Sequence, residues 1–472
     1  MASQSPGTFT RYRWQELTLL ILPFLIMLIA MTMLLVGGPG ANKQAAFSPK
    51  SLPAVQDMVP VFGLIGALLV TNIIMSIFFR KADQLLLPLV GLLSAIGVLM
   101  ATRLGPNIAV YRPNAAYAAT YGPKQLIWVL IGLTLCLITI FALRNTNWFE
   151  RYKYTWIVVG FLAILPSMIA GIRTLRSGTP THDTLGVGPF QLQPSELLKI
   201  AIVIFFAAYL SENRDIFTQG YMRLGRLHLP PLRQLGPLML MLGLALIIFL
   251  VVRELGLALL IYGLFLAMMY LGSGKMSYVL TSLGLFAVLA FIGYHLFSYV
   301  RLRFAVIGFD VVNWQNWTPA QDYFAKNQGA QVLQGIIALS SGGILGSGLG
   351  LGHPVLVSVI ESDMIFTGLG EEFGLAGLFA ILGIYLLIVY RGYRIAIEAT
   401  NPFNQLLAAG LTSVFAIQTL IICAGDMKFL PLTGIPLPFL SYGGSSIFAN
   451  YIIIGILLRI SYNTAVERDG TS

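Results

Sequence analysis

The amino-acid sequence predicts an all-α polytopic membrane protein. Of its 472 residues, 57% are hydrophobic and only 10% are charged, whereas a soluble globular domain carries about a quarter charged residues. Apolar windows close to the ~20 residues that a helix needs to cross a bilayer recur along most of the chain. The predicted helices therefore form a bundle within the membrane.

Twelve windows qualify, or nearly qualify, as spans. They lie at about 16–37, 58–79, 84–102, 125–143, 154–172, 195–211, 236–252, 255–272, 278–299, 363–390, 405–423 and 446–461. The first contains no charge from Leu17 to Val36. A run of that length exceeds the apolar region of a signal peptide, so it predicts an uncleaved anchor.

The net charge is +10. In a membrane protein, basic residues indicate first of all which loops are cytoplasmic, so no nucleic-acid binding is expected. With the N-terminus inside, 16 Lys and Arg fall on the cytoplasmic side and 11 on the opposite side, while Lys199 and Arg253 fall within spans. This bias predicts that both termini are cytoplasmic. The basic residues outside would suit an anionic substrate, or they are simply solvated.

The few residues that could bind metals or form disulfides are dispersed. Cys136 and Cys423 lie in separate apolar windows, and the four histidines show no ligand spacing. Neither a disulfide framework nor a thiolate metal site is expected. No tightly bound cofactor is predicted, and a requirement for a divalent cation stays open.

The run Pro431–Ser446 joins the last two windows and cannot continue a membrane helix. Proline lacks the backbone donor, and glycine weakens helix interiors. Broken backbone at membrane depth survives only where it is buried in protein or lines a wet cavity. The run therefore predicts either a re-entrant turn that only shapes the fold or part of a functional site.

Ionisable residues within the windows are candidates for function, because an unpaired charge in a membrane is costly. Glu196 and Lys199 lie three residues apart on one helix face, as a structural ion pair or as part of a site. Glu371 and Glu372 are adjacent within a long window. Both cannot face lipid, so one is expected to pair with a basic group or to stay protonated.

The largest external segment runs from about 300 to 362. Its glycine-rich tract 342–352 lacks the GK[ST] ending of a P-loop and predicts close packing instead. Asp322 lies there near Arg301, Arg303 and Lys326. A carboxylate beside cations could act as general base on a sugar hydroxyl while the cations hold a pyrophosphate. The alternative is an ordinary solvated helix cap.

Five segments resemble, in order, the motifs of the SEDS family (shape, elongation, division and sporulation), the FtsW- and RodA-like cell-wall polymerases. They are residues 188–199, 254–256, 319–334, 362–374 and 431–446. The resemblance implies a ten-helix core at 84–472, with the external loop 300–362. Residues 1–83 would then add two N-terminal transmembrane helices, twelve in total.

The resemblance also implies an activity. Members of this family are peptidoglycan glycosyltransferases that polymerise lipid II at the outer face of the bacterial cytoplasmic membrane, during division or elongation. They work beside a class B penicillin-binding protein, which crosslinks the strands. Whether the present chain serves division or elongation stays open.

The family's catalytic aspartate, in a P-aromatic-x-D-P pattern ahead of G-Y-Q-x-x-Q, corresponds to Asp322. Ala320, Tyr323 and Ala330 depart from that pattern, so the resemblance does not determine the detailed shape of the loop. The expected substrate-binding residues are Arg301, Arg303, Lys326, Glu196, Lys199, Gln331, Ser441 and Ser445.

Two other functions fit part of the pattern. A flippase or transporter of a lipid-linked sugar would also have many helices and buried charges. Transporters, however, carry matching interruptions in their two halves, and here the interruptions lie mainly in the C-terminal half. A non-catalytic scaffold for a partner enzyme would explain the departures around Asp322.

Overall fold

The computed structural model describes residues 12–37, 58–177, 185–187, 190–214, 222–224, 227–229, 243 and 254–471. Within these ranges the chain is almost entirely helical, as predicted. Two short antiparallel hairpins accompany the helices, and they are formed by β1 (Leu185–Val187) with β2 (Phe190–Leu192) and by β3 (Met222–Leu224) with β4 (Leu227–Leu229).

Nine helices in the described ranges are long and apolar enough to cross a membrane. They are α1 (Trp14–Gly37), α2 (Val59–Phe78), α3 (Leu86–Tyr111), α4 (Tyr121–Ala142), α10 (Leu255–Ser273), α11 (Met276–Leu296), α15 (Ile365–Glu398), α16 (Pro402–Asp426) and α17 (Gly444–Thr471). The 3-10 helix η4 (Pro113–Thr120) leads directly into α4. The chain is therefore a multi-pass membrane protein.

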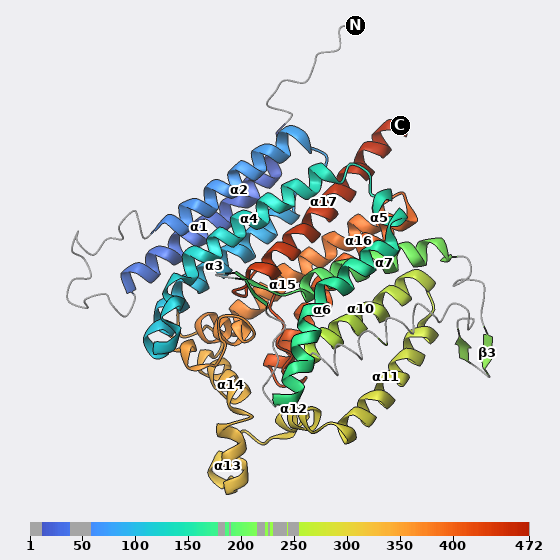
Figure 1. Cartoon of the computed structure of the whole chain (residues 1–472). Helices are drawn as coiled ribbons and strands as arrows, with labels where there is room; N and C mark the ends of the chain where they lie inside the picture. The colour runs from blue at the N-terminus through green and yellow to red at the C-terminus, as the bar shows by residue number, and fades with distance from the viewer. Residues whose placement is uncertain are drawn as a thin grey trace.

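The most deeply buried helices lie at the centre of the bundle. α17 packs along α4, α16 along α15, and α7 (Ser195–Glu212) along α6 (Lys153–Ser177) (Figure 1). α7 and α16 are buried along most of their length. Helices that are apolar on every side belong in such a position, because no face needs water. The short helix α5 (Asn147–Arg151) connects α4 to α6.

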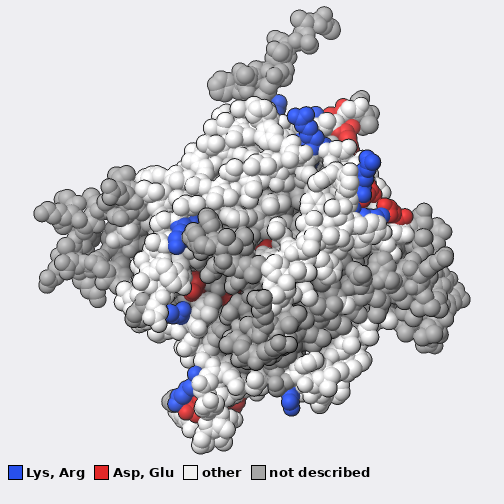
Figure 2. Space-filling view, in the orientation of Figure 1, with Lys and Arg blue, Asp and Glu red and all other residues white. Residues whose placement is uncertain are grey.

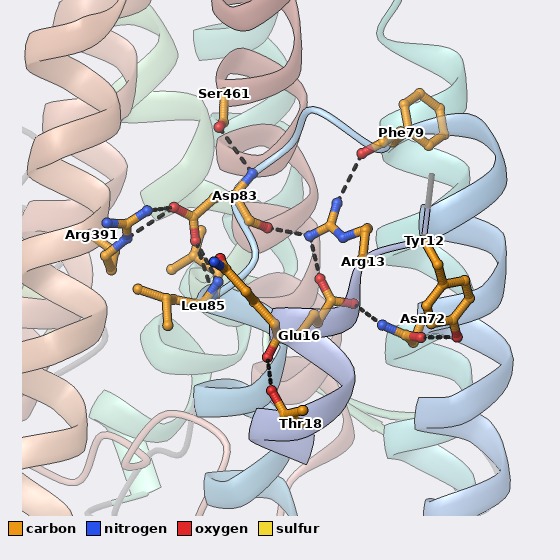
Figure 3. A network of polar contacts seen from close by, with 12 residues as sticks. Tyr12, Arg13, Glu16, Thr18, Asn72, Phe79, Asp83, Leu85, Arg391 and Ser461 are labelled. Carbon is orange, nitrogen blue, oxygen red and sulfur yellow. Dashed lines mark hydrogen bonds and ion pairs between the residues drawn. The ribbon is translucent and has the colours of Figure 1, made fainter. Parts of the chain in front are cut away.

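The two N-terminal helices pack against the rest of the bundle, α1 on α3 and α2 on α4. Arg13, just ahead of α1, forms an ion pair with Glu16, and both side chains are fully buried. Asn72 of α2 donates to Glu16 at 2.8 Å, and Arg13 donates to the backbone oxygen of Phe79 at 2.8 Å (Figure 3). These hydrogen bonds offset the cost of burying the pair.

Asp83 extends this network to the C-terminal helices. Its backbone oxygen accepts from Arg13, and its carboxylate accepts from Arg391 Nε of α15 at 2.9 Å. Its backbone N–H donates to Ser461 of α17 at 3.1 Å (Figure 3). The start of α1 and the last turns of α15 and α17 therefore share one end of the bundle.

A segment of short helices follows α11 at the other end of the bundle. It contains α12 (Ser298–Gly308), η6 (Trp314–Asn316), α13 (Pro319–Lys326) and α14 (Ala330–Gly342), and η7 (Pro354–Leu356) comes later in the chain. α13 projects from the molecule (Figure 1). On the visible face, charged side chains gather at the upper right and at the bottom of the view. Between them the described surface is mostly uncharged, apart from a few basic and acidic side chains at the left (Figure 2).

The helices of the structure extend beyond several predicted windows. α3 continues past the window 84–102 to Tyr111. Arg103, which the window leaves in the following loop, therefore lies within a helix. The helix can continue because Arg103 is neutralised inside the bundle, as described below. Apart from residue 243, the window 236–252 lies outside the described residues, as does Arg253.

Candidate functional site

The broken segment between α16 and α17 is buried in protein, as its backbone requires. Ile435, Leu437, Phe439 and Leu440 all belong to the core. The backbone oxygen of Pro436 accepts from Gln418 at 2.7 Å, and that of Pro438 accepts from Tyr385. Side chains of the neighbouring helices α15 and α16 thus supply donors to a backbone that helix geometry cannot satisfy.

Ser441 and Ser445, both predicted substrate ligands, bond to backbone in the structure. The Ser441 hydroxyl donates to the Ser362 oxygen at 2.6 Å and accepts from the Leu437 N–H at 2.7 Å. Ser445 accepts from the Gln193 N–H at 3.0 Å. The structure thereby brings the motif segments around 193, 362 and 441 together, although they are distant in sequence.

Glu196 and Lys199 form the buried ion pair that their spacing predicts. Their side chains are 6% and 1% exposed, and Lys199 Nζ lies 2.6 Å from Glu196 Oε2. Lys199 Nζ also donates to Gln418 at 3.0 Å and to Asn450 at 3.3 Å. The Lys199 ammonium thus combines one ion pair with two hydrogen bonds to amide oxygens. This arrangement favours the structural interpretation of the pair.

Gln418 connects that ion pair to the broken segment. Its oxygen accepts from Lys199, and its nitrogen donates to Pro436. Asn450 Nδ2 lies 3.2 Å from the hydroxyl of Ser446, at the start of α17. One hydrogen-bonded network therefore runs from α7 through α16 and α17 to the re-entrant turn.

Glu372 is the carboxylate of α15 that finds a basic partner, as predicted for one of the adjacent glutamates. Arg103 Nε of α3 lies 3.2 Å from Glu372 Oε1, and both side chains are almost fully buried. Arg103 Nη2 also donates to the backbone oxygens of Gly350 and Gly352, at 3.1 and 3.0 Å. Glu371 Oε1 accepts from the His353 N–H at 2.6 Å.

The glycine-rich tract wraps closely around the outer half of α15. A Cβ at Gly342 would lie 2.0 Å from the backbone oxygen of Gly370. Gly346 has a φ of 85°, and a Cβ there would lie 2.2 Å from the Glu372 oxygen. Only glycine tolerates such an approach together with left-handed backbone. The close packing predicted from this tract is confirmed.

Asp322 lies on α13, the helix that projects from the molecule (Figure 1). Thr318 and Gln321 form a capping box that starts this helix, with Pro319 in its first turn. The Asp322 carboxylate accepts from Lys326 Nζ at 2.7 Å, and the two side chains are 46% and 71% exposed. The Asp322 carboxylate is therefore accessible from solvent.

The remaining predicted ligands lie on the same side of the molecule. Arg301 is exposed on α12, and Arg303 Nη1 donates to the Leu432 oxygen at 2.7 Å. Gln331 is half-buried in the first turn of α14. Arg303 thus connects the segment of Asp322 to the broken turn. Glu196 and Lys199 belong to the separate buried network described above.

Sequence reasoning missed three polar partners within the bundle. Gln418 and Asn450 lie in apolar windows, where a lone amide is itself a signal, and Arg103 was placed in a loop. Among the described residues there is no group of three or more His, Cys, Asp and Glu that could hold a metal ion. Both cysteines are free and buried.

The comparisons with known proteins agree on one family. The model of the cell cycle proteins FtsW, RodA and SpoVE matches residues 83–466. The peptidoglycan glycosyltransferase RodA of Mycobacterium tuberculosis (strain ATCC 25618 / H37Rv) is 36% identical over 392 residues, 82% of this chain and 79% of the relative. Stage V sporulation protein E of Bacillus subtilis (strain 168) is 29% identical over 80% of this chain and 96% of its own.

Solved structures show the same fold at lower identity. A chain from a peptidoglycan synthase complex that coordinates polymerization and crosslinking aligns with a TM-score of 0.59 at 21% identity, over 81% of this chain and 98% of that chain. The rod shape determining protein RodA of Thermus thermophilus aligns with a TM-score of 0.52 at 20% identity, over 80% of this chain and 96% of its own. The protein belongs to the FtsW/RodA/SpoVE family of cell cycle proteins.

Proposed function

We propose that this protein is a peptidoglycan glycosyltransferase that polymerises lipid II into glycan strands at the outer face of the bacterial cytoplasmic membrane, during elongation or division. The observation that carries the proposal is the 36% identity to relatives named peptidoglycan glycosyltransferase RodA. The exposed Asp322–Lys326 pair on the external segment supplies the matching chemistry.

Asp322 acts as general base in the proposed reaction. The acceptor hydroxyl oxygen attacks the anomeric carbon of the donor sugar, and its proton passes to the Asp322 carboxylate. The bond from that carbon to the pyrophosphate oxygen breaks, and undecaprenyl pyrophosphate leaves with the electron pair. Lys326 and Arg301, both exposed near α13 in the sequence, stabilise the departing negative charge.

The proposal includes no tightly bound cofactor. No step of the proposed reaction is assigned to a metal. The proposed partner is a class B penicillin-binding protein that crosslinks the strands. The structural relative from a peptidoglycan synthase complex supports a partner of that kind.

We infer twelve spans, with two N-terminal helices in residues 1–83 and a ten-helix core in 84–472. The support is that the family model begins at residue 83, after α1 and α2. α6, α7 and the window 236–252 would complete the twelve. Both termini are cytoplasmic in this proposal, which agrees with the Lys and Arg bias and with the shared end of α1, α15 and α17.

Purified protein with labelled lipid II tests the function. We expect a ladder of glycan polymer on a gel, and more polymer when the class B partner is added. Transfer of labelled lipid II across vesicle walls without any polymer would favour the flippase instead. Absence of both reactions, alongside stimulation of the partner's crosslinking, would favour the scaffold.

Charge removal near α13 should weaken substrate binding. We expect the double variant Arg301→Gln with Lys326→Gln to raise the KM for lipid II about tenfold, because charge-assisted bonds to phosphate are lost. kcat should fall as well, because the same cations stabilise the departing pyrophosphate. Steady-state polymerisation rates measure both, with Lys124→Gln at the outer end of α4 as the matched control. An unchanged KM would place the pyrophosphate elsewhere.

A further inference from the structure

Lys428 occupies a position that normally belongs to glycine. α16 ends in a Schellman motif, in which the Phe429 N–H bonds to the Ala424 oxygen at 2.8 Å and the Lys428 N–H to the Gly425 oxygen at 3.1 Å. Lys428 has a φ of 67° there. Glycine adopts left-handed backbone without penalty, whereas a residue with a Cβ does not. The helix would end as well with glycine, so the lysine side chain contributes something else.

The side chain of Lys428 reaches across to the external segment. Its Nζ donates to the backbone oxygen of Phe309, which directly follows α12. Asp310 attracts the ammonium, while partial burial lowers the pKa of Lys428. Asp310 itself stays ionised, because bonds from the side chain and backbone of Asn313 and from the Val312 N–H lower its pKa.

Phe309 and Asp310 in turn hold the start of α13. The Phe309 ring lies 4.9 Å from that of Trp317 and 5.3 Å from that of Phe324, between centroids. Trp317 Nε1 donates to the backbone oxygen of Asp310 at 2.8 Å. Trp317 immediately precedes the cap of the helix that carries Asp322. A continuous set of contacts therefore runs from Lys428 to the helix of the proposed base.

Packing alone does little to hold this helix in place. Ala325 is the buried residue of α13. An open cavity of about 470 Å³ lies beside residues 309–312. It is also lined by Ile336, Leu339 and Ser340 of α14 and by Met427 and Lys428. Polar ties across the edge of this cavity are the Lys428–Phe309 bond and, further along, the Arg303–Leu432 bond.

We propose that Lys428 is a positioning residue, which holds residues 309–326 against the outer end of α16 so that Asp322 meets the acceptor hydroxyl. The proposal rests on the proposed function for its kinetic consequence. Misplacement of a catalytic group by about 1 Å can cost roughly 100-fold in rate. Loss of the tie should therefore lower kcat, while the ground-state affinity for lipid II changes little.

Three variants separate positioning from stability. Lys428→Met removes the side-chain donor, and Lys428→Arg keeps a donor. Lys428→Gly removes the donor and also the conformational cost of a left-handed φ at a residue with a Cβ. We expect kcat to fall about 10- to 100-fold in the Met and Gly variants with KM within about twofold. We expect the Arg variant to recover most of the rate. The Gly variant should match or exceed the thermal stability of the wild type.

Hydrogen exchange of the whole chain in nanodiscs supplies a readout that does not depend on activity. Backbone amides of residues 309–326 should exchange faster in Lys428→Met and Lys428→Gly than in the wild type, and not in the control Lys124→Met. Unchanged exchange in both variants, or full kcat in Lys428→Gly, would overturn the proposal. A wild type that exchanges as expected but makes no polymer would refute the proposed function and leave the tie intact.

Discussion

Asp322→Asn is expected to abolish lipid II polymerisation while leaving the fold intact. The amide keeps the shape and a hydrogen-bond acceptor but loses the basicity, and loss of a general base costs about 10²- to 10⁴-fold in rate. The broken contact to Lys326 is an exposed ion pair, worth less than ~1 kcal/mol. Polymer on a gel measures the rate, and thermal unfolding in detergent measures the fold.

Asp310→Asn is the matched control, because Asp310 is an exposed carboxylate of the same external segment. It should keep most of the activity, since one acceptor oxygen remains for the Asn313 and Val312 N–H groups. Near-normal synthesis by Asp322→Asn together with a dead Asp310→Asn would move the general base to Asp310. Full activity in both variants would count against a carboxylate base on this segment.

Lys199→Met is expected to cause the largest loss of stability. It leaves Glu196 almost fully buried without its cation and removes a donor from Gln418 and Asn450. Removal of one partner from a buried ion pair costs about 3–5 kcal/mol. Thermal unfolding and the yield of monodisperse protein measure the loss, which Glu196→Ala should share from the other side.

The exposed pair of Arg394 and Glu398 provides the comparison. These side chains are 52% and 40% exposed, and Arg394 Nε lies 2.8 Å from Glu398 Oε1. Arg394→Met should leave the thermal unfolding temperature almost unchanged, because solvent screens such a pair. Equal stability of Lys199→Met and Arg394→Met would show that the buried pair contributes no net stability.

The sequence predicts the helices well because hydropathy alone decides which segments lie in the membrane. The window 84–102, however, ends just before Arg103, because hydropathy cannot reveal a partner elsewhere in the chain. The partner of Arg103 is Glu372, on a helix that begins more than 250 residues later. The ends of helices that carry buried charges are therefore set by tertiary contacts.

The sequence predicts the residues of the candidate site better than it predicts their hydrogen-bond partners. Spacing alone indicated the Glu196–Lys199 pair, and the helix cap at Thr318 follows from local sequence. The packing of three helices around a broken turn decides which acceptors Lys199 reaches. It also brings Ser441 to the backbone oxygen of Ser362. In the sequence, Lys428 was only one of the 11 Lys and Arg residues assigned to the side opposite the cytoplasm.

The polar network around Asp83 has a consequence for biogenesis. Arg13 and Glu16 pair with each other, and their further hydrogen bonds come from Asn72, Phe79 and Asp83. The first 83 residues therefore contain all of these partners, and the pair can form before the rest of the chain is translated. By contrast, the Asp83 carboxylate can accept its bond from Arg391 only after some 300 further residues have been translated. Contacts of α1 and α2 with α3 and α4 can thus form early, whereas the bonds of Asp83 to Arg391 and Ser461 require that α15 and α17 have been synthesised.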